Sequence, residues 1–209
     1  MTVRLNVFEK LRTIHVFNRF MKDPGRLDLV LSLTRTAANQ VPPEDLPPSL
    51  REFAARGEET PLVDVDALRG LPEGTLGHAM VAHMDGLGFS PDDLDGHEPD
   101  STELALVSQH VQRCHDIHHV VTGYDTSIPG EVGLLAFYMS NFDAAPVQVL
   151  LAAVMLRPTV LGEAEEMVAV MDAMTEGWQR GKAADALFGV DWSVHWARPL
   201  ADVRADLGL

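Results

Sequence analysis

Glycines and prolines divide this chain into segments of helix length, and none of these segments alternates Val, Ile or Thr with polar residues as a strand does. Apolar residues instead recur at steps of three and four, as they do from Met167 through Val170, Met174 and Trp178. A chain of 209 residues is long enough to bury a core without disulfides. The sequence therefore predicts an all-α fold, a single-domain bundle of about eight helices.

Within residues 1–209 we expect two regions of one helical domain. Residues 1–70 hold N-terminal helices and the rigid connection Val41–Pro48, which contains four prolines. Residues 71–209 hold the longer helices and the candidate site, and the polar segment Ser90–Ser101 is expected to be a loop. The expected helices are Thr2–Met21, Leu27–Ala38, Ser49–Arg56, Thr75–Leu87 with Thr75 as its cap, Thr102–Gly123, one that begins near Ser127–Gly130, Val147–Leu156, Glu163–Leu187 and Leu200–Leu207.

Acidic residues outnumber basic ones, with 31 Asp and Glu against 16 Lys and Arg and a formal net charge of −15. Because proteins bind nucleic acid mainly by neutralising phosphates, this balance predicts no nucleic acid partner. The single cysteine, Cys114, excludes an intramolecular disulfide and a cysteine-rich zinc site. This usage is typical of a protein in a reducing compartment.

Positive charge is concentrated near the N-terminus, where residues 1–26 carry six Lys or Arg and two Asp or Glu. A basic helix with aromatic residues can lie on an anionic membrane surface, which would make a peripheral membrane contact. The alternative, which we favour, is a surface helix whose Phe8, Phe17 and Phe20 pack into the core. No segment has the form of a secretory signal.

The most apolar segment, Val132–Leu156, has the length of a transmembrane helix. Because a bilayer centre penalises the polar residues in its middle, we predict two buried helices, Val132–Phe142 and Val147–Leu156, in place of a span. Their apolar surface must meet a core, a second subunit or a lipid-like ligand. The polar or helix-breaking residues in its middle are Asn141, Asp143, Pro146 and Gln148. Five methionines suit the wall of an irregular cavity: Met139, Met155, Met167, Met171 and Met174.

Four of the nine histidines lie on one predicted helix, and two of them suggest a metal site. His115 and His119 are one turn apart, so their Cβ atoms are about 6 Å apart and both rings can reach one divalent cation. Asp116 lies about 100° further round the helix. It can add a carboxylate oxygen to the edge of the site or orient a histidine.

Glu131 completes the candidate site twelve residues after His119, in the first turn of the next helix. The reversal between Gly123 and Gly130 can bring it back against the histidine helix. Two imidazoles with one or two carboxylates suit zinc, iron(II) or manganese better than magnesium or calcium, and they leave a coordination position for water or substrate. The spacing thus offers His115, His119 and Glu131 as metal ligands, and Asp116 as a further ligand or as a residue that orients a histidine. If they are not both ligands, Glu131 or Asp116 can move a proton.

Simpler explanations exist for each of these residues. Histidine pairs with this spacing occur by chance, and Glu131 can serve only to stabilise a helix N-terminus. A second set, His110, Cys114 and His118, follows the same spacing, but no nearby residue completes it and a lone helical cysteine is usually a core residue. The acidic segment 92–96 lacks ligands at the first and last positions of a calcium loop.

The residues around this site resemble a known family, the coenzyme Q biosynthesis protein 4 family. Its His-Asp-x-x-His motif, followed after eleven residues by Glu, is similar to the run from His115 to Glu131. The likeness extends over about Leu71 to Leu209, and residues 1–60 match only in helical character. Further matching segments are Leu71–Gly77, Trp178–Gly181, Asp191–Trp192, Pro199–Leu200, Arg204 and Gly208.

The resemblance implies an all-helical fold and a divalent metal, zinc first, held by His115, Asp116, His119 and Glu131. It implies a hydrophobic channel for a polyprenyl tail, a homodimer and peripheral association with a membrane. The activity implied is metal-dependent, oxidative decarboxylation at the C1 carboxyl of a polyprenylated hydroxybenzoate. His118, between the two ligand histidines, departs from the motif. The chain also has no mitochondrial presequence, which fits a bacterial protein in the cytoplasm or on the inner face of the cell membrane.

Two alternatives to this enzyme follow from the same residues. One is a non-catalytic scaffold that binds a prenyl lipid for other quinone-biosynthesis enzymes. The other is a metallo-hydrolase of another small molecule, because metal–water chemistry is not restricted to quinones.

Overall fold

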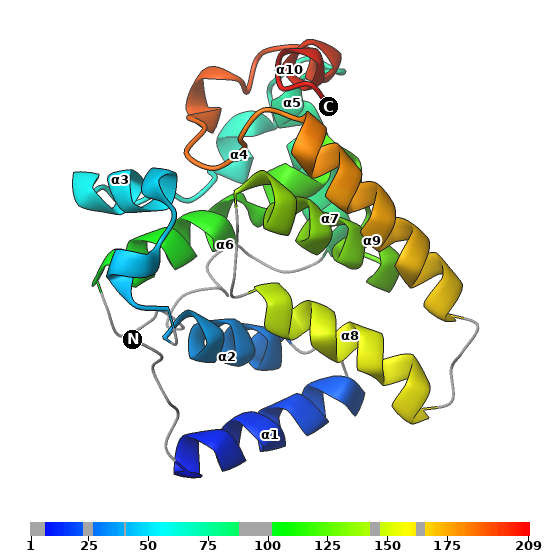
Figure 1. Cartoon of the computed structure of the whole chain (residues 1–209). Helices are drawn as coiled ribbons and strands as arrows, with labels where there is room; N and C mark the ends of the chain where they lie inside the picture. The colour runs from blue at the N-terminus through cyan, green and yellow to red at the C-terminus, as the bar shows by residue number, and fades with distance from the viewer. Residues whose placement is uncertain (1–6, 23–26, 40, 88–101, 143–146, 162–165) are drawn as a thin grey trace.

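The computed structural model describes residues 7–22, 27–39, 41–87, 102–142, 147–161 and 166–209, and in these ranges the chain is all-α, as predicted (Figure 1). They contain ten α-helices, two short 3-10 helices and no strand. The helices are α1 (Val7–Lys22), α2 (Leu27–Ala38), α3 (Pro48–Arg56), α4 (Val65–Leu68), α5 (Leu76–Leu87), α6 (Thr102–Thr122), α7 (Ile128–Asn141), α8 (Val147–Leu161), α9 (Glu166–Ala183) and α10 (Leu200–Asp206), with 3-10 turns η1 (Pro43–Asp45) and η3 (Trp192–Val194).

Most helix bounds agree with the predicted ones to within a few residues. The hydroxyl of Thr75 accepts the N–H of His78 at 3.3 Å and so caps α5 as expected. The prediction for α9 was four residues too long at its C-terminal end, because the side chain of Asn141 accepts the N–H of Leu187 at 2.8 Å and holds that segment outside the helix. The polar segment Ser90–Ser101 and the acidic segment 92–96 lie outside the described residues.

One buried hydrophobic cluster includes residues from α1 to α10. Within it α7 and α9 pack along each other, and Figure 1 shows them side by side. Their backbones touch where Gly177 faces Gly133, since a Cβ on Gly177 would overlap the carbonyl oxygen of Gly133. Two glycines therefore set how closely the helix that carries Glu131 lies against α9.

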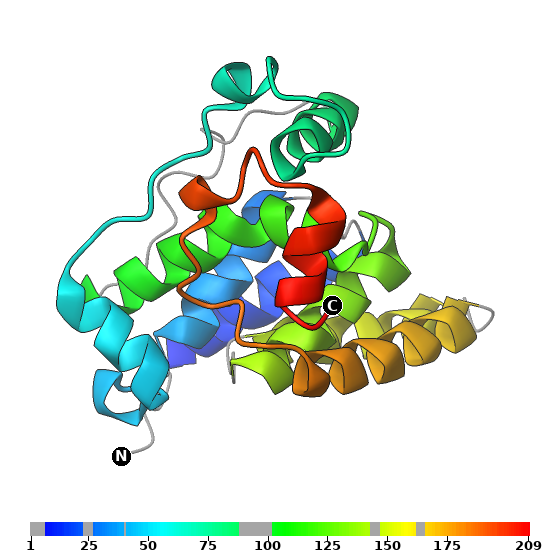
Figure 2. The same cartoon turned by 90° about the horizontal axis from the view of Figure 1, so that it is seen from above.

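The segment after α9 holds the start of α5 through main-chain hydrogen bonds. The main-chain N–H groups of Leu76 and Gly77 donate to the carbonyls of Arg198 and Trp196, each at 2.9 Å, so residues 196–200 hold the start of α5. Figure 2 shows α10, which follows this segment, in front of α6.

Two arginines hold the C-terminal end of α6, the helix of the four histidines. Arg204 donates to the carbonyls of Val120 and Val121 at 2.8 and 2.9 Å, and Arg180 donates to that of Thr122 at 2.7 Å. The last carbonyls of a helix have no hydrogen-bond partner within the helix, and the two guanidinium groups supply one. Their positive charge also stabilises the helix, because the C-terminal end of a helix dipole is negative.

The N-terminal helix α1 packs on α2 and α8. Phe20 is buried in the core and Phe17 packs against it, as the favoured prediction has it, while the side chain of Phe8 lies outside the described residues. Val132–Leu156 forms two helices, as predicted, because α7 ends at Asn141 and α8 begins at Val147. No described helix combines the length and the apolar character needed to cross a membrane.

Candidate metal centre

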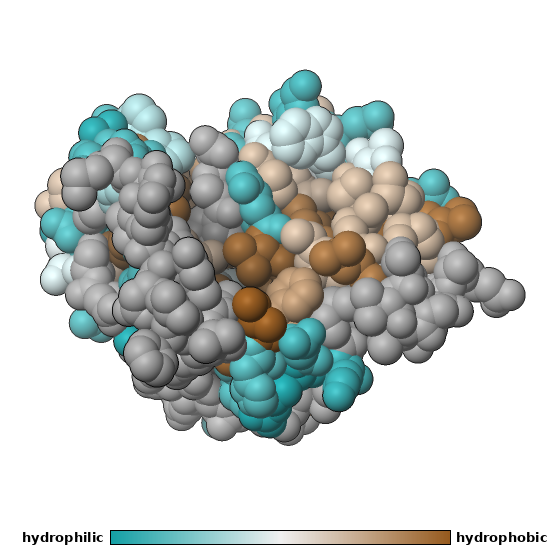
Figure 3. All heavy atoms as spheres, turned by 60° about the horizontal axis from the view of Figure 1, so that its bottom comes forward, coloured by the Kyte–Doolittle hydropathy of each residue, from teal (hydrophilic) through white to brown (hydrophobic). Residues whose placement is uncertain are grey.

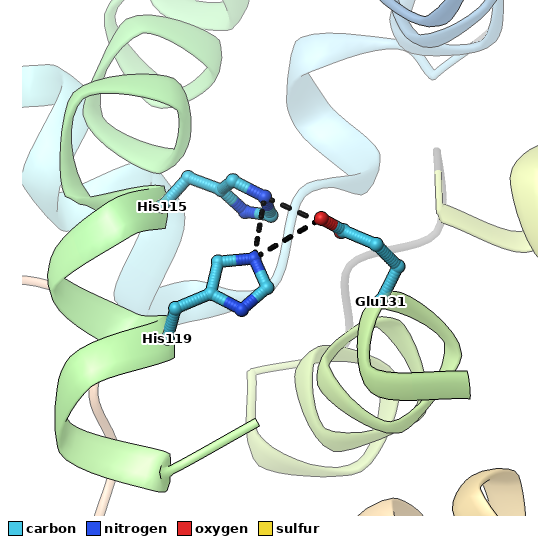
Figure 4. A group of neighbouring side chains, drawn as sticks. All are labelled: His115, His119 and Glu131. Atoms are coloured by element: carbon cyan, nitrogen blue, oxygen red, sulfur yellow. Dashed lines mark hydrogen bonds and ion pairs between the residues drawn. The ribbon is translucent and has the colours of Figure 1, made fainter. Parts of the chain in front are cut away.

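His115 and His119 lie on the same face of α6, as their spacing predicts (Figure 4). Their Nε2 atoms approach to 3.1 Å. The ring of His119 is fixed by the main chain, because its Nδ1 lies 3.0 Å from the carbonyl oxygen of Tyr124. A carbonyl can only accept a hydrogen bond, so Nδ1 carries a proton, and a neutral His119 ring would present the lone pair of Nε2 to a cation.

Glu131 reaches the two histidines from the first turn of α7. Its Oε1 lies 3.3 Å from Nε2 of His119 and its Oε2 lies 3.5 Å from Nε2 of His115. The chain reverses here because Gly123 ends α6 at a φ of 79° and the hydroxyl of Ser127 accepts the N–H of Gly130 at the start of α7. We call His115, His119 and Glu131 the metal triangle.

The dimensions of the metal triangle fit one cation. Ligand atoms about 2.0–2.1 Å from a tetrahedral zinc ion are about 3.3 Å from one another, and the three distances here are 3.1, 3.3 and 3.5 Å. The side chain of His119 is 1% exposed and that of Glu131 is 38% exposed, so the triangle is closed on one side and open on the other. Three ligands with an open side are the arrangement of a catalytic metal site.

The charges of the triangle stabilise one another. Burial raises the pKa of Glu131, but its hydrogen bonds to His115 and His119 outweigh this and lower the pKa well below its usual value. Burial likewise lowers the pKa of His115, and the hydrogen bond and charge of Glu131 outweigh it and raise the pKa. The site therefore favours positive charge between these groups, which a bound cation would supply.

Asp116 is the one predicted ligand that the structure does not bring to the metal triangle. Its Oδ1 lies 3.2 Å from Nε2 of His83 on α5, and the ring of His83 stacks on that of His119 with centroids 5.7 Å apart. Burial raises the pKa of Asp116, but the hydrogen bond of His83 and the nearby histidine charges outweigh it and lower the pKa. Asp116 and His83 thus form a polar pair beside the triangle.

His83 is a candidate functional residue that the sequence did not reveal. It lies 33 positions before Asp116 on another helix, and no second ligand type occurs near it at a helical spacing. Tyr138, whose hydroxyl lies 3.2 Å from Nδ1 of His115, was missed for the same reason.

The second histidine set does not come together as a metal site in the described structure. His110 donates from Nδ1 to the hydroxyl of Thr60 at 2.7 Å and accepts the N–H of Gly189 at Nε2, so both of its nitrogens have partners. Cys114 is buried in the core, and burial raises the pKa of its thiol to about 12. His110 is held by hydrogen bonds and Cys114 by the core, so these two residues have structural places in the fold.

An apolar cavity of about 370 Å³ lies between α7, α8 and α9. It begins about five residues beyond Glu131 along α7, which is about 8 Å of helix. Of the five methionines expected to line a cavity, Met139 and Met174 do so. The lining residues are Ala136, Met139, Gln148, Leu151, Met174, Thr175, Trp178 and Gln179.

Comparison with known proteins identifies the family of this chain. The family model described as coenzyme Q (ubiquinone) biosynthesis protein Coq4 matches residues 58–209. A mitochondrial ubiquinone biosynthesis protein COQ4 from Laccaria bicolor is 27% identical over 217 residues, which cover 99% of this chain and 72% of that protein. Its counterpart from Aspergillus flavus is 33% identical over 144 residues, which cover 68% of this chain and 49% of that protein. The matched region thus spans 72% of the first relative and about half of the second.

The fold is also found in a solved structure. It is a crystal structure of a protein from Nostoc punctiforme, described as a candidate ubiquinone biosynthesis protein. The two structures superpose with a TM-score of 0.77 at 23% sequence identity, over 94% of this chain and 96% of the other. At this identity the likeness shows the helical architecture alone.

Proposed function

The chain belongs to the family of coenzyme Q (ubiquinone) biosynthesis proteins Coq4, and from this premise we propose that it is a metal-dependent enzyme acting on the C1 carboxyl of a polyprenylated hydroxybenzoate. The reaction replaces that carboxyl by a hydroxyl group and releases CO₂. The observation that carries the proposal is the metal triangle, in which two imidazoles and a carboxylate from two helices meet with one side open.

The proposed ion is zinc, with iron(II) or manganese as alternatives, because these ions share a preference for imidazole and carboxylate ligands. When bound by His115, His119 and Glu131, it supplies a Lewis acid that stabilises negative charge developing on the carboxylate or ring oxygen of the substrate. The side chain of His115 is 32% exposed, so a head group can approach the triangle from that side.

Replacing a carboxyl by a hydroxyl withdraws two electrons, so the reaction needs an oxidant. We propose dioxygen: the carboxylic acid, water and O₂ give the phenol, CO₂ and hydrogen peroxide. The residue we propose to move the proton is Asp116, since it lies beside the triangle and is paired with His83. An ionised carboxylate can accept a proton from the substrate. Glu131, the other predicted catalytic carboxylate, is committed to the triangle through both oxygens.

The apolar cavity supports a prenylated substrate. Its lining is almost entirely apolar surface of α7, α8 and α9, and α7 also carries Glu131. Burial of each CH₂ of a prenyl tail there contributes about 0.8 kcal/mol of binding free energy. A tail in the cavity and a head group at the triangle would lie along the same helix.

We also propose a homodimer and a peripheral contact with the inner face of a bacterial cell membrane. Large apolar side chains are exposed on α8 and α9, beside the cavity, and they suit contact with a lipid surface or a second subunit. Figure 3 views the molecule from the side of α1 and α8, and apolar atoms are exposed in the middle of that face. The exposed apolar residues of α8 and α9 are Leu156, Val168, Met171 and Trp178.

A non-catalytic lipid scaffold is the second candidate function, and the same cavity favours it, because an apolar cavity can hold a prenyl lipid without any chemistry. The two functions differ in turnover. Metal-loaded protein is given a prenylated 4-hydroxybenzoate labelled in its carboxyl carbon, under air and under nitrogen, and labelled CO₂ is measured.

We expect labelled CO₂ from the wild type under air, none from Glu131→Gln, and wild-type release from the control Glu73→Gln, since Glu73 lies on an exposed turn. Lipid binding without any CO₂ release would favour the scaffold. Release that continues undiminished under nitrogen would contradict dioxygen as the oxidant.

A further inference from the structure

Behind His115 lies a buried hydrogen-bond relay that the metal triangle does not include. The hydroxyl of Tyr138 on α7 lies 3.2 Å from Nδ1 of His115 and 2.8 Å from Nδ1 of His118. Tyr138 and His118 are each 1% exposed. The relay therefore joins one ligand histidine to its neighbour on α6 through a tyrosine on the next helix, out of contact with water.

The two ligand histidines differ in what holds their second nitrogen. His119 donates from Nδ1 to a main-chain carbonyl, which can only accept. His115 faces a hydroxyl, which can accept from His115 or donate to it. With a cation on Nε2 of His115, the ring proton must be on Nδ1, so the hydroxyl has to accept it.

His118 allows the hydroxyl of Tyr138 to accept a hydrogen bond from His115. A hydroxyl that accepts from His115 needs somewhere to send its own hydrogen, and Nδ1 of His118 is the acceptor at 2.8 Å. In a neutral imidazole one nitrogen carries the proton and the other accepts, so Nδ1 of His118 can accept when the proton is on Nε2.

This arrangement leaves the other nitrogen of His118, Nε2, without a hydrogen-bond partner among the described residues. When Nδ1 of His118 accepts the hydrogen bond of Tyr138, the proton of the neutral ring is on Nε2, so the unpaired group is a buried N–H. It is buried where the ring meets that of Trp192 edge to face, with centroids 5.7 Å apart. A buried N–H without a partner is costly, and an apolar side chain of similar size would avoid it. The unpaired N–H therefore fits a role for His118 beyond filling space.

We propose that Tyr138 and His118 are positioning residues, which together hold His115 in the orientation and tautomer that present Nε2 to the cation. The proposal rests on the proposed function, because it requires a cation at the metal triangle. It also gives a purpose to His118, the residue that departs from the family motif. Neither residue touches the cation.

The test is a double-mutant cycle on zinc affinity, measured by competition with a chelating indicator. Tyr138→Phe removes the acceptor of His115, and His118→Leu leaves the hydroxyl with no acceptor except Nδ1 of His115, which drives the wrong tautomer. We expect each variant to bind zinc about 10–100-fold more weakly than the wild type. The double variant should bind about as well as Tyr138→Phe alone, because both changes break one relay.

The matched control is Ser140→Ala. Ser140 also carries a partly buried hydroxyl on α7, and this hydroxyl donates to main-chain carbonyls of α7, at Ala136 and Phe137, away from both ligand histidines. The zinc affinity of this variant should stay within about threefold of the wild type. Thermal unfolding of each metal-free variant shows that it is folded. If His118→Leu does not fold, the comparison of Tyr138→Phe with Ser140→Ala still tests the relay.

Three outcomes would overturn the relay. If Tyr138→Phe binds zinc as tightly as the wild type does, the relay is wrong but the proposed metal site is unaffected. Multiplying losses in the double variant would show that the two residues act separately, as ordinary core side chains do. A wild-type protein that binds no divalent metal would overturn the proposed function and the relay with it.

Discussion

Among single residues, Asp116 is the one whose surroundings differ most from what helical spacing suggests. Its carboxylate is turned to His83, which occupies Oδ1 at 3.2 Å. The helix position of Asp116 permits either a ligand or a partner of a histidine, and a residue on α5 decides between them. The metal triangle and the Asp116–His83 pair are thus separate groups of side chains.

Asp116→Asn should therefore retain the metal and lose turnover. The amide keeps the shape of the side chain but cannot accept the substrate proton, so we expect turnover to fall by about 10²–10⁴-fold. Metal content is measured by elemental analysis, alongside CO₂ release. The control is Asp172→Asn on the exposed face of α9. Loss of metal from Asp116→Asn would show instead that Asp116 is a ligand.

The sequence predicted His115, His119 and Glu131 because local geometry governs them. Two residues one helical turn apart share a face, and a short reversal returns the next helix to the same place. His83 and Tyr138 lie 33 and 23 positions from their partners on α6. Helical spacing cannot predict these contacts, because the residues lie on different helices that only tertiary packing brings together.

At the scale of the helices, the contact between α7 and α9 sets the position of Glu131. Gly177 lies on the carbonyl oxygen of Gly133, two residues after Glu131. Any side chain at Gly177 must push α9 away from α7 or bend one of them.

Gly177→Ala should therefore destabilise the fold although alanine is the better helix former. We expect the free energy of unfolding to fall by about 1–3 kcal/mol, measured by urea denaturation. The control is Gly86→Ala on α5, where a Cβ would meet nothing within 4 Å. That substitution should raise stability by about 0.5–1 kcal/mol. Equal effects of the two changes would contradict the close packing of α7 on α9.

Helix prediction succeeded where glycine, proline or a cap marks a boundary. The bounds of α2 are those expected, and α6 begins at the expected Thr102. The four-residue helix α4 was missed because it is too short to show a helical period. The end of α9 was misplaced because a side chain of α7, Asn141, determines it.

For the molecule as a whole, buried neutral histidines make the fold sensitive to acid. Burial, and then the charge of Arg56, lower the pKa of His110 from 6.5 to about 4. Between these values the unfolded chain binds a proton that the folded chain does not, so stability falls as the pH falls. The contribution is complete above about pH 6.5 and is lost progressively down to about pH 4.

Replacing His110 should therefore make the free energy of unfolding depend less on pH below neutrality. We expect the wild type to lose about 3 kcal/mol more than His110→Gln between pH 7 and pH 4, measured by urea denaturation at each pH. Glutamine can keep hydrogen bonds to Thr60 and Gly189 without titrating. The exposed His78→Gln should leave the curve unchanged. Parallel curves for wild type and His110→Gln would contradict the prediction.

The arginines at the end of α6 also set an order of events during synthesis. Arg204 follows the carbonyl of Val121 by 83 positions, and Arg180 follows that of Thr122 by 58. A ribosome delivers the histidine pair long before it delivers the cations that hold the end of their helix. The end of α6 can therefore reach its final hydrogen bonds only after Arg204 has been synthesised.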